Sequence, residues 1–566
     1  MHYELTQNAT IVKQKLVFPT PTATAFTIRS LHSTTSAAAR VAAKKKVLIL
    51  AGAFGGAFVF KSLCGYAPGL LTDWHIFWWF YTWGWKRAIY GEAWGWIIEL
   101  TPAFFGAGML SGLNASWSFM IGAILAWGLI GPLTIKYGVA VSKPMSDGIP
   151  EYQNYFSMSA VNGDFVNGGS PRYWLMWVRT LILVTHRTSN APLPQPGIMV
   201  MLCYSFAEIA ASAPIFWRSF KQVYRSIQFE YQSWSARRAG RTFTDTLDAD
   251  DVMLDDPALP HEQVPVWAWT LGLALSICGT LIVGKLSFGM DVGVGILALI
   301  LAFLFSFIGV QASGTTDVNP LGIIAKASQL VIGGVTKGQG ASIKVAQTTN
   351  LLAGSIAGQA ASNGVDMTGD LKTGHLLRAA PNAQFWAQVL GSVIGIWLSV
   401  GLFVLFAEAY PCLIDLSIDC EAFGMPAVAA WRSVAIAVTA PTLPIHPTSG
   451  YTAIALGILS VLTVLLKYTV VPQRYHVWVP NWNAIGLGFV VPQVYYPFAM
   501  VIGAHVAYWW AAKRPKSWEM WGFALSAGLV AGEGMAGVLT ALLTIVKADG
   551  GVYGSAVACP LYTYCG

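Results

Sequence analysis

Long apolar runs separated by short polar segments make up most of the chain. Three of these runs, at 100–135, 433–466 and 475–512, contain no Asp, Glu, Lys or Arg at all. An uncharged apolar run longer than about 18 residues is typical of a membrane-spanning helix, and each of these has room for two helices or for one helix and a re-entrant piece. The pattern therefore predicts an all-α, polytopic transmembrane helical bundle.

The apolar runs predict about twelve spans, with one or more broken or re-entrant helices. The segment 319–335 is apolar but short, and it holds Lys326 and Gln329, which predicts a half-helix or a re-entrant element. The full spans are predicted near 47–66, 94–113, 116–135, 197–217, 265–284, 289–310, 345–361, 383–407, 425–441, 450–471, 489–512 and 522–546.

The polar segments divide the chain into four parts. A polar amino-terminal segment covers 1–46 and ends in three lysines, and a loop at 218–264 is basic in its first half and acidic in its second. These segments bound two transmembrane regions, 47–217 and 265–566. Four predicted spans separate the two basic clusters, so both lie on one side of the membrane, which the positive-inside rule makes the cytoplasm.

The composition supports a membrane protein rather than a soluble one. Of the 566 residues, 55% are hydrophobic and 11% are charged, whereas a soluble globular protein has about a quarter charged residues. Basic residues of membrane proteins mostly mark cytoplasmic loops, so the net charge of +7 says little about nucleic acid. We expect a lipid bilayer as partner and no nucleic acid.

Two pairs of cysteines lie close together in the sequence. Cys412 and Cys420 share one short loop, and Cys559 and Cys565 share the carboxyl-terminal tail. Each pair forms a disulfide if its segment faces an oxidising compartment, and the alternative is a pair of free thiols.

Motifs of catalysis and of cofactor binding are absent from the sequence. It contains no H-E-x-x-H, no G-x-S-x-G and no G-x-x-x-x-G-K-[ST], and its cysteines lack the spacing of a metal site. We therefore predict no enzyme, no cofactor and no metal centre.

Polar groups occur where the pattern predicts membrane depth. A charge at mid-membrane costs roughly 2.5–3.5 kcal/mol on insertion scales, and a chain tolerates it where the charge is paired or lines a wet pathway. Two stretches stand out, an interrupted helix at 311–329 and a polar run at 359–375, although a solvated loop explains the second equally well. The candidate substrate-binding residues in these stretches are Asp317, Asn319, Lys326, Gln329, Gln359, Asp366, Asp370, Lys372 and His375.

Four titratable residues are candidates for proton coupling. A carboxyl group whose pKa is raised by burial, or a histidine, titrates near neutral pH. Glu99, Glu208 and Glu533 lie in or beside apolar runs, and His375 lies in the second polar stretch. A packed, hydrogen-bonded structural role is the competing interpretation for each of them.

Several long motifs resemble the central signatures of the oligopeptide transporter superfamily, in particular its fungal-type small oligopeptide transporters. They are spread from residue 16 to the tail in family order, and each is longer and more specific than a lone glycine motif. The resemblance implies a secondary transporter that imports small peptides, glutathione-like peptides or metal chelates by proton symport. The motifs are LVFPTPTATAFTIRSLH, SPRYWLMW, GIMVMLCYSFAE, NPLGIIAKASQLVIGG, DLKTGHLLRAAPNAQFWAQVLGSVIG and SAGLVAGEGMAGV.

The sequence departs from that family in two places. Family members usually have several more spans before the FPTPTATAFTIRSLH element, which here begins at residue 18, so we expect amino-terminal spans to be missing. The family pattern also runs from PRYWLMW almost directly into PGIMVMLCYSFAE, whereas residues 178–195 intervene here. We interpret them as an insertion, a translated short intron.

The leading interpretation is a proton-coupled importer of small oligopeptides that works by alternating access around a midplane site. A transporter of metal chelates such as an iron–siderophore amine is the alternative within the family. A non-transporting, truncated membrane protein is the alternative from another class. The family implies the plasma membrane, and the oligomeric state is left open.

Overall fold

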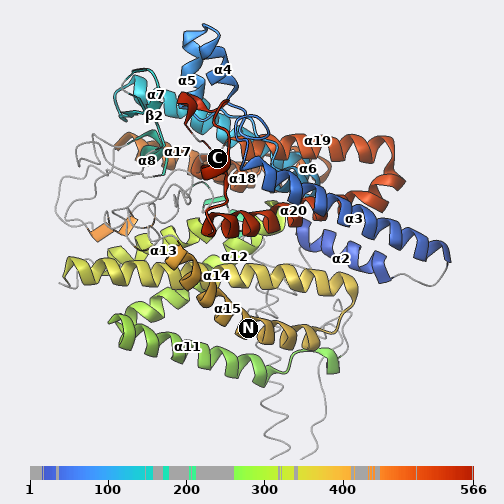
Figure 1. Cartoon of the computed structure of the whole chain (residues 1–566). Helices are drawn as coiled ribbons and strands as arrows, with labels where there is room; N and C mark the ends of the chain where they lie inside the picture. The colour runs from blue at the N-terminus through green and yellow to red at the C-terminus, as the bar shows by residue number, and fades with distance from the viewer. Residues whose placement is uncertain are drawn as a thin grey trace, which may run out of the picture.

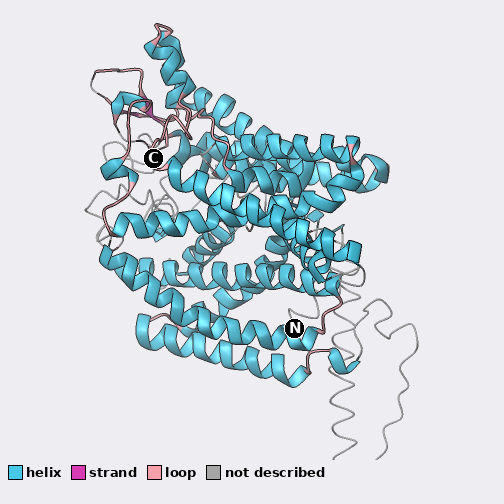
Figure 2. Cartoon of the chain, turned by 45° about the vertical axis from the view of Figure 1, so that its right-hand side comes forward, coloured by secondary structure: helices cyan, strands magenta, loops and turns pink. Residues whose placement is uncertain are grey.

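The computed structural model describes most of the chain as α-helix (Figure 2). The described residues are 16, 18–32, 37–146, 148–156, 170–176, 200, 203–204, 207–208, 210–211, 260–316, 319, 321–336, 342–409, 414, 431, 434–435, 438–439, 447–491, 494–563 and 565.

The described helices are labelled in chain order (Figure 1). In the first half they are α2 (Pro19–His32), α3 (Ala37–Cys64), α4 (Ile76–Thr82), α5 (Ile89–Ala93), α6 (Pro102–Ala123), α7 (Gly131–Lys136), α8 (Pro171–Met176) and α11 (Val266–Phe288). In the second half they are α12 (Val292–Thr316), α13 (Leu321–Thr336), α14 (Ile343–Leu377), α15 (Pro381–Ala409), α17 (Pro447–Thr469), α18 (Trp482–Val490), α19 (Tyr495–Lys513), α20 (Pro515–Ile545) and α21 (Gly550–Tyr553). Two short strands, β1 (Lys143–Pro144) and β2 (Gln153–Asn154), pair antiparallel.

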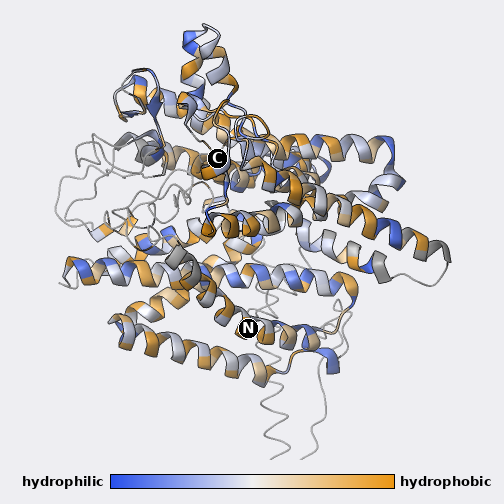
Figure 3. Cartoon of the chain, in the orientation of Figure 1, coloured by the Kyte–Doolittle hydropathy of each residue, from blue (hydrophilic) through white to orange (hydrophobic). Residues whose placement is uncertain are grey.

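Seven helices of the described residues are long and apolar enough to cross a membrane, which confirms a multi-span membrane protein. In α15 none of the residues in the most apolar stretch is buried, and large hydrophobic residues such as Leu390, Ile394 and Trp397 are exposed on it. Hydrophobic residues recur along the long helices (Figure 3). Such surfaces suit contact with lipid. The predicted count of twelve spans is not reproduced, and the predicted spans at 197–217 and 425–441 lie mostly outside the described residues. The seven are Ala43–Cys64, Pro102–Lys136, Val266–Phe288, Val292–Gly314, Pro381–Val404, Tyr451–Thr469 and Pro515–Ile545.

Two of the predicted elements differ from the structure. Where two spans were predicted at 94–113 and 116–135, one helical stretch runs over 102–136, with a kink at Gly112 (φ 79°) and a π-helical segment, Ile124–Ile130. The polar run at 359–375 is not a loop, because α14 continues through it for 35 residues. The chain turns only after it, at Arg378, whose backbone is left-handed.

The break predicted in the interrupted helix at 311–329 is present. Helix α12 ends at Thr316 and α13 begins at Leu321, and Asn319 lies between them. The Asn-Pro pair explains the break, since proline disfavours a helical residue before it and is itself suited to a helix start.

The first and last long helices, α3 and α20, pack side by side and run parallel. An added Cβ on Gly528 would lie 2.6 Å from the carbonyl oxygen of Leu50, and one on Gly532 would lie 2.3 Å from that of Phe54. Two glycines four residues apart thus let the two backbones touch, as in other close transmembrane helix pairs. The amino-terminal ends of both helices therefore lie on one side of the bundle.

The described part of the predicted polar segment 1–46 belongs to the bundle rather than preceding it. The amide of Phe18 donates to the carbonyl of Gly314 at 3.1 Å, and the Thr373 hydroxyl donates to the carbonyl of Pro21 at 3.0 Å. Leu16 and Phe18 are buried against Val310 and Val365. The polar composition of 1–46 hid this contact, because α2 needs only a narrow apolar side.

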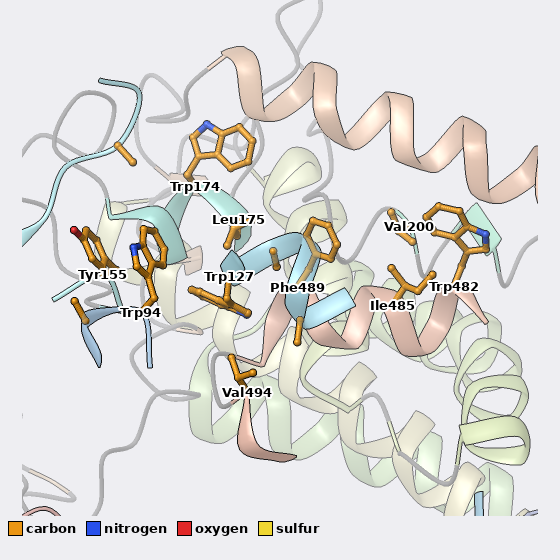
Figure 4. Packing of buried hydrophobic residues seen from close by; sticks show 14 of the residues in the cluster. Trp94, Trp127, Tyr155, Trp174, Leu175, Val200, Trp482, Ile485, Phe489 and Val494 are labelled. Carbon is orange, nitrogen blue, oxygen red and sulfur yellow. The ribbon is translucent and has the colours of Figure 1, made fainter. Parts of the chain in front are cut away.

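Two buried hydrophobic clusters form the interior. The aromatic cluster surrounds Trp127, which is fully buried (Figure 4). The Trp127 indole donates a hydrogen bond to the carbonyl of Gly488 at 3.0 Å. In the same cluster Trp94 stacks on Tyr155, with ring centroids 4.0 Å apart. The second cluster lies between α12, α13 and α14. Helix α18 contacts both α8 and α12, so it lies between the two clusters.

The carboxyl-terminal tail returns to the loop that follows α3. The amide of Ser555 donates to the carbonyl of Tyr66 at 2.9 Å, and the Trp79 indole donates to the carbonyl of Ala558 at 3.3 Å. A disulfide joins Cys559 to Cys565. The other candidate pair, Cys412 and Cys420, lies outside the described residues.

Candidate functional site

Three carboxyl groups from three distant segments gather around one lysine. Lys61, near the end of α3, lies with its Nζ 2.7 Å from Glu99 Oε1 and 3.7 Å from Glu533 Oε1. Asp73, in the loop after α3, forms a hydrogen bond with Glu99 and is close enough to both Glu99 and Lys61 to interact electrostatically. We call Lys61, Asp73, Glu99 and Glu533 the carboxylate cluster.

Each carboxyl group of the cluster is held in place by its own element. Glu533 projects from α20 and accepts the backbone N–H of Ala103 at 2.6 Å. That amide is in the first turn of α6, where unpaired N–H groups and the helix dipole favour a negative charge. Glu99 immediately precedes the same helix and is 4% exposed.

Asp73 is the member of the cluster whose titration is displaced toward neutral pH. Burial and the neighbouring negative charge of Glu99 raise its pKa to about 7, against the opposing effect of Lys61. The sequence analysis missed both Asp73 and Lys61. The sequence pattern gives little indication that either residue is functional. Lys61 is a single cation at the end of an apolar run, and Asp73 is an isolated acidic residue beside a Trp-rich segment.

A cavity of about 500 Å³ opens beside the cluster. It lies at the carboxyl-terminal ends of α3 and α20, whereas the lysines at 44–46 and Lys513, Arg514 and Lys516 lie toward the opposite ends of these helices. Its lining mixes apolar and polar surface, and its polar residues include Lys61, Tyr66, Thr72, Asp73, Thr540, Thr544 and Asp549.

The structure places the other two proton-coupling candidates elsewhere. Glu208 accepts from Lys467 Nζ at 2.7 Å and from the Tyr468 hydroxyl at 2.6 Å, so it has both a charge partner and a hydroxyl partner on α17. His375 is half-buried in the last turn of α14. Of the four candidates, only Glu99 and Glu533 are brought together.

A second polar region lies where α13 packs on α14. An added Cβ on Gly358 of α14 would lie 2.7 Å from the Cβ of Ala325, so the two helices approach closely there. Asn319, just before α13, and Gln329 on α13 contact α14 here, and Lys326 is buried on α13 next to Ala325. We call these three residues, with Asn350, Ser362 and Asp366 of α14, the α13–α14 seam.

Polar groups of the seam are only partly satisfied. The Asn319 amide donates to Ser362 Oγ at 2.8 Å and to Asp366 Oδ1 at 3.1 Å, and the Asn350 amide donates to the carbonyl of Gln329 at 2.7 Å. Among the described residues, however, Asn319 Oδ1, Gln329 Oε1 and Asn350 Oδ1 are buried and accept no hydrogen bond. Lys326, Gln329 and Asn350 are at most 4% exposed.

The remaining described candidates lie on α14 but outside the seam, and they do not gather. Gln359 is exposed and bonds to Asn363 on its own helix. Asp370 is exposed and accepts from Gln388 of α15 at 3.1 Å, whereas Lys372 is buried. Two positions apart on a helix, Asp370 and Lys372 point in different directions. Asp317 and the predicted insertion 178–195 lie outside the described residues.

No set of three His, Cys, Asp or Glu side chains in the described part of the chain is arranged to hold a metal ion.

The similarity to known proteins extends over nearly the whole chain. A family profile described as "OPT oligopeptide transporter protein" matches residues 4–544. The chain belongs to the OPT family. It is therefore a member of a family of membrane transporters rather than of enzymes, as the sequence motifs predicted.

Relatives of two kinds are found within the OPT family. The Saccharomyces cerevisiae protein YGL114W, named as an oligopeptide transporter, is 26% identical over 464 residues, which cover 79% of this chain and 58% of the yeast protein. Metal-nicotianamine transporter YSL2 of Arabidopsis thaliana is 24% identical, covering 95% of this chain and 72% of its own length. YSL11 of Oryza sativa, named as a metal-nicotianamine transporter, is 22% identical with 95% and 68% coverage. The chain thus spans less than two thirds of the length of the yeast relative. Because plant and yeast proteins both match, the comparisons do not distinguish the predicted fungal-type subgroup from the plant relatives.

Proposed function

We propose that the chain is a proton-coupled secondary transporter that imports small oligopeptides or glutathione-like peptides. The observation that carries the proton coupling is the carboxylate cluster beside its cavity. Three carboxyl groups share one lysine, so the cluster would hold two net negative charges if all were ionised. Partly buried charges of one sign repel strongly, and a proton relieves that repulsion.

Asp73 is the entry point for that proton. It lines the cavity, its pKa of about 7 lets it exchange protons near neutral pH, and it is hydrogen-bonded to Glu99. From Glu99 the path continues through Lys61 to Glu533. Neutralising Glu533 weakens its hold on the first turn of α6, which links protonation to the position of a membrane helix.

The orientation of the cluster supports import. The lysines at 44–46 and the basic residues at the start of α20 lie on the side that the positive-inside rule makes cytoplasmic. The cavity and the Cys559–Cys565 disulfide lie toward the other side, which suits an oxidising exterior. The proton then loads from outside the cell, as expected for a plasma-membrane importer.

The seam is the proposed place of contact with the cargo. It carries the break between α12 and α13, and broken helices at membrane depth commonly form the binding sites of secondary transporters. Asn319, Lys326 and Gln329 are its contributions from the first polar stretch, and Asp366 is its contribution from the second. Gln359, Asp370, Lys372 and His375 stay proposals of lower rank, because the structure leaves them outside this contact.

The proposal is tested by uptake of a labelled tetrapeptide and of labelled glutathione into cells that lack their own transporter. Uptake should rise as the external pH is lowered. Glu533→Gln keeps an oxygen to accept the Ala103 amide but cannot exchange a proton, so it should abolish the pH dependence. Glu519→Gln, an exposed substitution on the same helix, is the control. Full pH dependence in both Glu99→Gln and Glu533→Gln would refute coupling through the cluster.

A metal–nicotianamine complex is the second candidate cargo. The plant relatives that are named for it align with 95% of this chain, more than the yeast relative does. Competition separates the two: excess iron–nicotianamine and excess tetrapeptide are added against the same uptake signal. If the expressed and correctly inserted chain takes up neither cargo, the non-transporting interpretation is the right one.

A further inference from the structure

Two buried basic side chains, on α13 and on α8, lie near enough to each other to interact electrostatically. Lys326 is 4% exposed in the middle of α13, and Arg172 is 9% exposed in the first turn of α8. Arg172 acts on Lys326 through its charge. Helix α18 contacts both α8 and α12, and α12 contacts α13, so the two helices that carry these cations belong to one packed region.

Neither cation is neutralised by a described residue. One guanidinium nitrogen of Arg172 donates to the carbonyl of Phe156 at 3.2 Å, but its Nε is buried without an acceptor. No carboxylate of the described residues forms an ion pair with Arg172 or Lys326. By contrast, Lys61 and Lys467 each hold a carboxylate oxygen at 2.7 Å.

Burial of two like charges is costly unless an anion joins them. Removing one charged group from water without a partner costs several kcal/mol even after relaxation, and a second charge of the same sign adds repulsion. An anion placed between the two would be held by charge-assisted hydrogen bonds, with the planar guanidinium suited to a carboxylate. The arrangement therefore has the chemistry of an anion-binding site.

We propose that Lys326 and Arg172 form a subsite for a carboxylate group of the transported molecule. This inference rests on the proposed function and names the chemical group that the cargo presents. Gln329 lies one helical turn from Lys326, and Gln329 Oε1 and Asn350 Oδ1 are buried acceptors that receive no hydrogen bond from a described residue. They accept N–H groups of the same molecule, so the cargo carries a carboxylate with N–H donors nearby, as a peptide does and as a metal–nicotianamine complex does.

The test compares competitors that differ only in the carboxylate. A tetrapeptide with a free carboxyl terminus and the same peptide with a carboxyl-terminal amide compete against uptake of the labelled free acid. In the unchanged chain the amide should inhibit about 10- to 100-fold more weakly, the usual range for a charge-assisted hydrogen bond. In Lys326→Gln and Arg172→Gln that ratio should fall toward one, while Lys344→Gln, an exposed substitution on α14, should preserve it.

Iron–nicotianamine forms the second arm of the same experiment. If it, rather than the peptide, loses potency in Lys326→Gln and Arg172→Gln, the subsite still holds and the carboxylate belongs to a chelate. Equal inhibition by acid and amide in the unchanged chain, together with chelate inhibition that both variants leave intact, overturns the proposal.

A binding measurement keeps this inference separate from transport. The purified chain in detergent is heated with either the acid or the amide, and the shift of its unfolding temperature is recorded for the unchanged chain and each variant. Stabilisation by the acid that both variants lose supports the subsite even if no uptake is seen, in which case only the proposed function fails. If neither peptide nor the iron–nicotianamine complex stabilises the unchanged chain, the subsite is refuted.

Discussion

Lys61 and Lys326 are both membrane-depth lysines, yet their surroundings are opposite. Lys61 has two carboxylates within 4 Å and a third close by, and the excess charge around it is negative. Lys326 has a second cation nearby and, among the described residues, no carboxylate partner. The first region is internally paired and carries excess negative charge, whereas the second holds two cations that pair with no carboxylate of the described residues.

The difference separates two tasks of a coupled transporter. A network of paired carboxyl groups can gain and lose a proton with small rearrangements, since each group keeps a hydrogen-bond partner. A site for cargo must instead leave groups unsatisfied until the cargo arrives, at a cost in stability. Assigning the carboxylate cluster to the proton and the seam to the cargo follows from this contrast.

The largest expected effect comes from breaking the helix contact under either region. Gly532→Leu drives a side chain into the backbone of α3, and Gly358→Leu drives one into α13. Overpacking costs about 1–3 kcal/mol or more, so both variants should give little monodisperse protein in detergent size-exclusion chromatography. Gly537→Leu, where an added Cβ meets nothing within 4 Å, should elute as the unchanged chain does. Normal elution of Gly532→Leu would mean that α3 and α20 do not touch as described.

Removing each lysine should change stability in opposite directions. Lys61→Met strands Glu99 and Glu533, and breaking a buried pair costs up to about 3–5 kcal/mol, less here because the Lys61 side chain is 31% exposed. Lys326→Met removes an unpaired buried cation and should raise the unfolding temperature by a few degrees. Thermal unfolding in detergent measures both. A fall in both variants would show that Lys326 has a partner after all.

Asp73→Asn should remove one component of the pH dependence of stability. The pKa of Asp73 is raised from 3.8 to about 7, so the folded state binds this proton more tightly than the unfolded state. Its contribution is therefore complete below about pH 4 and is lost as the pH rises to 7. The unfolding temperature of the unchanged chain should fall across that window more steeply than that of Asp73→Asn. Asp291→Asn, an exposed substitution, should keep the slope of the unchanged chain.

The smallest effect is expected on α14 beyond the seam. Asp370 is exposed and bonded to Gln388, and Lys372 is buried on another side of the helix, so the two should act independently. A double-mutant cycle of Asp370→Asn and Lys372→Ala should give a coupling energy below about 0.5 kcal/mol in thermal unfolding. A larger coupling would mean that the two side chains meet.

Apolar runs that end at charged residues predicted their helices well. Helices α11 and α17 begin and end within a few residues of the predicted spans, because Lys285 and Lys467 mark their ends. The uncharged run at 100–135 has no such marker, and two spans were predicted where one continuous helical stretch occurs. The polar run at 359–375 looked like a loop because its small residues, such as Ala361 and Gly364, supply a buried helix side with little hydrophobicity.

The candidate site was predictable in parts but not as a whole. A glutamate inside an apolar run is costly enough to notice, and Glu99 and Glu533 were both identified in this way. That Lys61 joins them could not be predicted, because the cluster brings together residues that are far apart in the sequence. In the same cluster, 430 positions separate Ala103 from Glu533. Arg172 was seen only as part of a motif, since nothing in the sequence places α8 near α13.

Because α3 and α20 run parallel, the number of membrane crossings between them must be odd. The chain leaves α3 on one face of the membrane and must enter α20 from the other, so it crosses an odd number of times in between. Ten of the twelve predicted spans lie between these two helices, an even number, so they cannot all be single crossings. Joining the two predicted at 94–113 and 116–135 into the one helical stretch at 102–136 leaves nine, an odd number. The same change leaves three predicted spans between the lysines at 44–46 and the basic half of 218–264, so the prediction that both basic clusters lie on one side of the membrane no longer follows from the span count.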